Sequence, residues 1–159
     1  LSAAPLYDPI GPWLDAAFAI VAKYPVQDRD ACQSLGIPTW LYGHEPPARF
    51  ALTIAKYFAN SVREEGLLMI AKQGVVFAPG SAGTIQEIFQ DAAQNHYRTA
   101  GHASPMVLFG TEYWTEKYSA WPLLQQLSAD RNYANLLTLT DAESEVIERI
   151  AAFEPPPLA

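Results

Sequence analysis

The sequence predicts an α/β protein built on a doubly wound, Rossmann-like parallel sheet with helices on both faces. Short apolar runs alternate with longer segments in which apolar residues recur at helical spacing. Strands of a parallel sheet are buried on both faces, so they read as short continuous apolar runs, and each is joined to the next by a helix. Right-handed crossovers favour the doubly wound arrangement, and in such a sheet ligands are expected at the carboxyl ends of the strands.

The first half of the chain is expected to contain two helical regions and one strand. Residues 12–24 (PWLDAAFAIVAKY) have apolar side chains at helical spacing and are followed by Pro25, which stops a helix. Residues 38–43 (PTWLYG) are aromatic and β-branched, which favours a buried strand. Residues 48–72 again show a helical pattern, with a break near Asn60 or Ser61, and we expect Ser61 to cap a second helix.

The second half alternates strand and helix more regularly. The three expected strands are residues 75–78, 106–109 and 136–139. The expected helices are residues 83–97, residues 112–127 with a kink or break at Pro122, and a last helix that Asp141 caps and that ends near Phe153. We expect residues 1–153 to form one domain and residues 154–159 (EPPPLA) to be a disordered tail.

The composition excludes several classes of function. With 10 Lys or Arg against 17 Asp or Glu the net charge is -7, so the overall field does not attract the phosphate backbone of a nucleic acid. The single cysteine, Cys32, cannot form an internal disulfide, and no Cys/His spacing typical of a metal site is present. The sequence contains no apolar run long enough to span a bilayer and no signal-peptide pattern. We therefore expect a cytoplasmic protein that binds neither nucleic acid nor a membrane.

The most informative segment is the glycine-rich turn between the strand at 75–78 and the helix at 83–97. It reads PGSAGT over residues 79–84, and these small residues let the backbone pass close to a ligand. The first N–H groups of the helix are unpaired and, with the helix dipole, attract an anion such as a phosphate. Ser81 or Thr84 adds a hydroxyl, whereas the lysine and spacing of a P-loop are absent. Tight packing of a strand on a helix is the alternative explanation.

One acidic residue lies one turn into that helix. It belongs to a polar stripe at i, i+3, i+4 and i+7 formed by Glu87, Gln90, Asp91 and Gln94. The glutamate is either a site residue beside the turn or a solvated partner of the helix dipole. His44, at the end of the strand expected in the first half, lies where α/β folds bind ligands, and a structural or solvated histidine is the alternative.

The segment PGSAGTIQE resembles the PGGxGTxxE signature of the LOG family, the cytokinin-activating phosphoribohydrolases and their bacterial relatives, once labelled lysine decarboxylase-like. The fixed positions of this motif are occupied by Pro79, Gly80, Gly83, Thr84 and Glu87. The serine at position 81 departs from the second glycine, a form usual in a bacterial branch of the family. The resemblance covers residues 36–140, and the family's upstream arginine falls at Arg63.

The resemblance implies hydrolysis of the N-glycosidic bond of a nucleoside 5′-monophosphate to a free base and ribose 5-phosphate. Glu87 would stabilise the oxocarbenium-like ribose and position or deprotonate the attacking water, and Arg63 would orient the nucleotide or help the base leave. The turn that would hold the phosphate consists of Gly80, Ser81, Ala82, Gly83 and Thr84. Gln90 and His44 are further candidates, and no metal or organic cofactor is implied. A non-catalytic nucleotide-binding or carrier protein on the same fold is the alternative.

Family members also begin with a strand-turn-helix portion that carries a second glycine-rich turn, GGGxGxM, and this chain contains nothing like it. The four expected strands are fewer than a complete doubly wound sheet has, and the chain begins at Leu1. We therefore expect a leading portion of the domain to be missing and one sheet edge to be uncovered. The resemblance also suggests a homodimer whose site lies near the interface, with Trp114 and Trp121 as core or interface residues.

Overall fold

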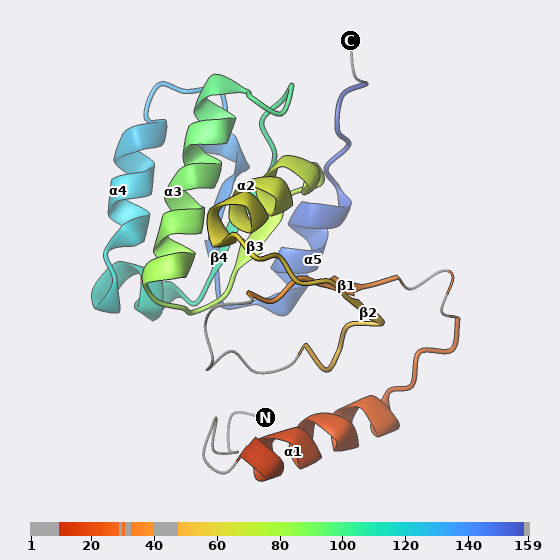
Figure 1. Cartoon of the computed structure of the whole chain (residues 1–159). Helices are drawn as coiled ribbons and strands as arrows, with labels where there is room; N and C mark the ends of the chain where they lie inside the picture. The colour runs from red at the N-terminus through yellow and green to blue at the C-terminus, as the bar shows by residue number, and fades with distance from the viewer. Residues whose placement is uncertain (1–9, 29, 31–32, 40–47, 158–159) are drawn as a thin grey trace. The chain divides into compact units, whose positions relative to one another are not determined.

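The computed structural model describes residues 10–28, 30, 33–39 and 48–157 of the chain (Figure 1). The chain divides into two compact units, which we call unit 1 (Leu1–Arg63) and unit 2 (Glu64–Ala159). The positions of these units relative to one another are not determined. The expectation of one domain over residues 1–153 therefore stays a prediction.

Unit 1 contains a helix and a two-stranded parallel sheet. Helix α1 (Ile10–Lys23) confirms the helix expected at residues 12–24. Strand β1 (Leu35–Gly36) pairs in parallel with β2 (Thr53–Ile54). Of the strand expected at residues 38–43, only the first two residues are described, and the second of them forms a single parallel bridge.

The helix expected between residue 48 and the break near Ser61 is wrong. This segment contains β2, and the N–H of Thr53 donates to the carbonyl of Ser34 at 3.1 Å. Backbone pairing with a segment far along the chain outweighs a helical pattern, and a β-branched residue such as Thr53 suits a strand. The helix after the break is confirmed as α2 (Asn60–Ile70), but Ser61 lies inside it and does not cap it.

Unit 2 contains a three-stranded parallel sheet in the order β3-β4-β5. Its strands are β3 (Val75–Phe77), β4 (Met106–Phe109) and β5 (Leu137–Thr140), which confirms the three strands expected here. Because all three run parallel, their carboxyl ends meet at one edge of the sheet. The protein is thus α/β, with two small parallel sheets flanked by helices, consistent with a Rossmann-like but incomplete fold.

Helices lie on both sides of the sheet of unit 2 (Figure 1). α3 (Ala82–Tyr97) and α4 (Ala120–Ser128) lie side by side on one side, and α5 (Glu143–Ala151) contacts β4 and β5 from the other. A short π-helix, η1 (Tyr113–Lys117), precedes α4, and a 3₁₀ turn, η2 (Ala134–Leu136), precedes β5. Each strand of this three-stranded sheet is therefore followed by a helix, as the crossover pattern predicts.

The apolar core of unit 2 lies between α3, α4 and the sheet. Its buried members are Phe77, Ile88, Ala92, Met106, Leu108, Trp114, Ala120 and Leu124. Trp114 is fully buried, and its indole N–H donates to the carbonyl of Phe109 at 3.0 Å, so this polar group is satisfied inside the core. Burying one large apolar side chain contributes roughly 1.5–3 kcal/mol, so this cluster holds α3 firmly in place.

Two expected helix boundaries are wrong. The break after β4 lies between η1 and α4 and not at Pro122, which occupies the first turn of α4, where proline is tolerated. Asp141 does not cap α5, whose capping position is Ala142. The Asp141 carboxylate instead accepts the N–H of Thr111 at 2.8 Å, which joins the turns after β4 and β5 and lowers the pKa of Asp141. Aspartate is a common helix-capping residue, but its residue type does not show that the turn after β4 is close enough to bind it instead.

Candidate functional site

The glycine-rich turn connects the carboxyl end of β3 to the first residue of α3. A Cβ on Gly80 would lie 2.1 Å from the hydroxyl oxygen of Thr84, so only glycine fits there. The carbonyl of Gly80 also accepts a hydrogen bond from the Tyr113 hydroxyl at 2.5 Å. A Cβ on Gly83, in contrast, would meet no atom within 4 Å. The turn is therefore tightly packed at Gly80, against Thr84 and Tyr113, and has free space at Gly83.

The start of α3 has the features of an anion site. The first hydrogen bond within the helix runs from the N–H of Ile85 to the carbonyl of Ser81, at 3.0 Å. The N–H groups of Ala82, Gly83 and Thr84 precede it and belong to the first turn, where N–H groups have no partner inside the helix. The Ser81 side chain makes no capping hydrogen bond, and these four residues are exposed or half-buried.

A hollow of about 440 Å³ lies beside this turn, within unit 2. Its lining comes from α2 (Glu64, Leu67, Leu68, Ala71), from β3 and the residues after it (Val75, Val76, Phe77, Ala78, Pro79), and from α3 (Thr84, Glu87). Most of these side chains are apolar, and two carboxylates and one hydroxyl interrupt them. Ligand sites commonly combine an apolar lining with a few polar groups in a volume of this size.

The structure brings part of the predicted site together around this hollow. Glu87 is half-buried and lines the hollow together with Thr84. The turn residues Ser81, Ala82 and Gly83 adjoin the hollow in sequence but do not line it. Gln90 is half-buried one turn further along α3 and does not line it either. The turn and the glutamate are therefore neighbours in space as well as in sequence.

Arg63 is the last residue of unit 1, whereas Glu87 belongs to unit 2. The Arg63 guanidinium donates to the Asn60 side-chain oxygen at 2.9 Å and to the carbonyl of Ile37 at 3.2 Å. These bonds orient the arginine within its own unit. The pairing of Arg63 with Glu87 stays a prediction, and the candidate His44 lies outside the described residues, as does Cys32.

A second carboxylate of the hollow, Glu64, was not predicted from the sequence. Only 2% of Glu64 is exposed, and its carboxylate accepts the side-chain N–H of Gln86 at 2.7 Å. The signal that could have found it is its position on α2, where it precedes the apolar residues Leu67 and Leu68 by one turn. A glutamate is rarely fully buried on the apolar side of a helix unless it is paired or hydrogen-bonded.

The polar stripe predicted on α3 is wrong at Asp91. This carboxyl is 2% exposed, on the same buried side of α3 as Ile88, Ala92 and Asn95, and its Oδ2 has no hydrogen-bond partner among the described residues. Burial without a partner disfavours the charged form and raises the pKa of Asp91 to about 7. Helical spacing allowed both placements, because Asp91 lies at i+4 from Glu87 and also at i+3 from the buried Ile88.

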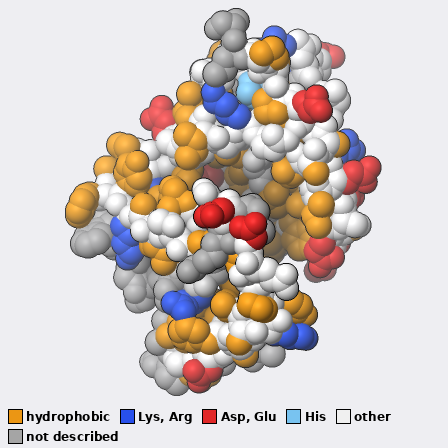
Figure 2. Space-filling view, turned by 90° about the vertical axis from the view of Figure 1, so that its right-hand side faces the viewer, with side chains coloured by type: hydrophobic (Ala, Val, Ile, Leu, Met, Phe, Trp, Pro, Cys, Tyr) orange, Lys and Arg blue, Asp and Glu red, His pale blue; other side chains and the backbone are white. Residues whose placement is uncertain are grey.

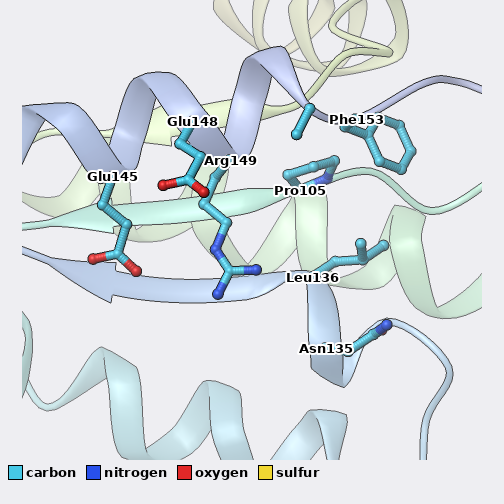
Figure 3. A pocket seen from close by; sticks show the side chains of 8 residues that line it. Pro105, Asn135, Leu136, Glu145, Glu148, Arg149 and Phe153 are labelled. Atoms are coloured by element: carbon cyan, nitrogen blue, oxygen red, sulfur yellow. The ribbon is translucent and has the colours of Figure 1, made fainter.

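Within the described ranges, no group of three or more His, Cys, Asp and Glu side chains is arranged to hold a metal ion. None of the helices in the described part of the chain is long and apolar enough to cross a membrane. A separate hollow of about 430 Å³ under α5 is lined by Glu145, Glu148 and Arg149, among others (Figure 3). Because two carboxylates and one guanidinium line this hollow, its charge does not favour the binding of an anion.

Known proteins provide no identification of this chain. No protein-family model matches it, and a search of the curated proteins finds no match. The likeness of residues 79–87 to the LOG signature therefore stays a resemblance.

Proposed function

We propose that this protein hydrolyses nucleoside 5′-monophosphates at the N-glycosidic bond and releases a free base and ribose 5-phosphate. The observation that carries the proposal is that Glu87 and Thr84 line one hollow directly beside the anion-attracting start of α3. The resemblance of residues 79–87 to the LOG signature supports it independently of the geometry.

The proposed chemistry uses the turn and Glu87 in sequence along α3. The nucleotide phosphate accepts hydrogen bonds from the N–H groups of the first turn, including that of Gly83. Glu87 lies five residues after Ala82, which is about 7.5 Å along the helix axis. A ribose whose phosphate lies at the first turn could therefore reach the Glu87 carboxylate. Water attacks C1′ while the C1′–N bond breaks, the electron pair stays on the base nitrogen, and a proton is transferred to the base. The carboxylate stabilises the positive charge on the ribose and orients the water.

The apolar lining of the hollow suits the base. The side chains of Leu67, Leu68 and Val76 offer surfaces against which a flat ring packs. Glu64 provides a buried acceptor for an N–H or exocyclic amino group of the base. Arg63 is the group that we assign to orient the nucleotide, and the resemblance further implies a homodimer.

The test is release of base and ribose 5-phosphate from AMP, GMP, CMP and UMP by the whole chain. Glu87→Gln keeps the size of the side chain and removes its charge, so we expect turnover to fall about 10³-fold while nucleotide binding persists. Glu116→Gln, at an exposed position away from the hollow, is the control and leaves turnover unchanged. Nucleotide binding by the wild type without turnover would reject hydrolysis and identify a nucleotide-binding or carrier protein.

A further inference from the structure

A polar hollow at the other end of the unit 2 sheet takes no part in the proposed reaction. It has a volume of about 270 Å³ and is lined by the end of α3 (Asn95, His96, Arg98), by Ala103, and by the loop before β5 (Asp130, Arg131, Asn132, Tyr133). The segments on which it lies lead into the amino ends of β4 and β5. α3 has 16 residues, so this hollow and the glycine-rich turn lie at ends of the helix about 24 Å apart.

Positive charge is concentrated here in a unit that is otherwise acidic. Between Glu64 and Ala159 the chain contains twelve Asp or Glu and only five Lys or Arg, namely Lys72, Arg98, Lys117, Arg131 and Arg149. Two of these five line the hollow, against one acidic residue, Asp130. On the face drawn in Figure 2, Lys and Arg side chains are scattered among hydrophobic ones. A pair of arginines around one concave space therefore contrasts with the acidic composition of unit 2.

Across the described residues, no side-chain hydrogen bond or ion pair involves the guanidinium of Arg98 or Arg131, and both side chains are exposed. Unpaired guanidinium groups keep their full capacity to bind an oxyanion, and Arg is well suited to phosphate because its planar fork donates two parallel hydrogen bonds.

Both loops that carry the arginines are held in place by hydrogen bonds. The buried Asn95 side chain donates to the carbonyl of Ser104 at 3.1 Å and accepts the N–H of Ser104 at 2.9 Å, which fixes the segment after Arg98. The N–H of Arg131 donates to the carbonyl of Ser128 at 2.9 Å. Tyr133, which also lines the hollow, is 2% exposed. The two guanidinium groups thus extend from ordered backbone, which reduces the entropy lost on binding.

The backbone at this hollow is conformationally costly. Arg98 (φ 53°) and Asp130 (φ 62°) are the two non-glycine residues with positive φ among the described residues, and both line the hollow. Glycine adopts this conformation most easily, and it is the usual residue where an α-helix ends in the left-handed region. A side chain kept at such a position suggests a use for that side chain.

We propose that this hollow binds a phosphate group, free or carried by a small phosphomonoester, through Arg98, Arg131 and Asn132. The volume suits a phosphate with a small substituent and not a complete nucleotide. This site is separate from the turn at the start of α3 and does not depend on the proposed hydrolysis.

The experiment follows the backbone amide NMR signals of the whole chain during titration with inorganic phosphate and, separately, with ribose 5-phosphate, with chloride at equal ionic strength as the reference. We expect saturable shifts at Arg98, Arg131 and Asn132 that chloride does not produce. Tighter binding of ribose 5-phosphate identifies a phosphomonoester as the ligand, and equal binding identifies free phosphate.

Four variants decide between binding and a merely structural role. Arg131→Gln and Arg98→Asn each weaken binding about tenfold, and asparagine at position 98 tolerates the left-handed backbone. Arg149→Gln, which removes an arginine outside the hollow, changes nothing. Asp130→Asn removes the one nearby negative charge and tightens binding about threefold, a gain that misfolding cannot produce. Shifts no larger than those with chloride, or equal losses in Arg149→Gln, would overturn the proposal.

Discussion

The two ends of α3 present different groups to which an anion could bind. At its first residue, backbone N–H groups of a glycine-rich turn adjoin a hollow with apolar walls and the carboxylates of Glu64 and Glu87. At its last residue, the side chains of Arg98 and Arg131 surround a smaller, polar hollow. The first end combines a phosphate-attracting backbone with acidic groups suited to reaction at a sugar. The second has cations and no comparable carboxylate pair, which suits binding without chemistry.

The difference predicts that the attraction of phosphate is not enough to separate the proposed reactive site from the proposed binding site. On the two proposals made above, a negative protein binds phosphate at two places, through backbone dipoles at one and through a local pair of arginines at the other. The proposed hydrolysis uses a carboxylate near the sugar, and among the described residues the first hollow is lined by two, Glu64 and Glu87, whereas Asp130 is the one acidic residue of the second. Substitutions in α3, the helix between the two hollows, are expected to have the largest effects.

The largest effect is expected from Asp91→Asn, in the middle of α3. The pKa of Asp91 is raised from 3.8 to about 7, so the folded state binds a proton more tightly than the unfolded state. The free energy of unfolding then decreases by about 1.4 kcal/mol per pH unit between pH 4 and 7, and levels off above pH 7. The variant lacks this loss, so its stability advantage approaches roughly 4 kcal/mol, as an upper limit, above pH 7.

Urea denaturation of both proteins from pH 5 to 8.5 measures this advantage. Glu116→Gln, which changes an exposed acid, provides the control and is expected to show no such pH-dependent gain. An advantage that is the same at every pH would mean that Asp91 is charged throughout and that its burial does not shift its titration. Phosphate shifts at the two ends of α3 are expected to remain unchanged at constant pH.

A second variant separates the two ends. Gly83→Asp fits without a clash, since a Cβ there meets no atom within 4 Å, and it places a carboxylate where the phosphate is expected. Nucleotide binding at the start of α3 should weaken about ten- to a hundredfold, while stability is kept because an acid in the first turn favours the helix. In phosphate titrations, the amides of Arg98 and Arg131 should shift as in the wild type. Parallel losses at both ends would show that the sites are not separate.

The smallest effect is expected from Glu64→Gln, which tests the carboxylates of the first end. If Glu64 accepts the exocyclic amine of a base, KM for AMP and CMP rises about tenfold, KM for UMP changes less, and kcat is kept. The matched control is Glu65→Gln, the neighbouring exposed glutamate that does not line the hollow. A fall in kcat for all nucleotides alike would instead place Glu64 in the chemical step.

Much of unit 2 was predictable because its signals are local. The runs at residues 75–78 and 106–109 are apolar and short, and the strands β3 and β4 follow them within a residue. The helix expected at residues 83–97 is confirmed, since glycine and the apolar spacing mark its start and its face. Unit 1 was predicted less well, because the local pattern around Thr53 is helical and does not show that this residue pairs with Leu35.

The sequence by itself determined the strand, turn and helix that carry Gly80 and Glu87, because sterics at a glycine and helical periodicity act over a few neighbouring residues. Only the tertiary structure decided that Glu64 is buried beside Glu87, that Asp91 lies in the core, and that Arg98 and Arg131 surround one hollow. These relations depend on packing between segments that are distant in the chain, and burial, charge and pKa are set by that packing and not by residue type.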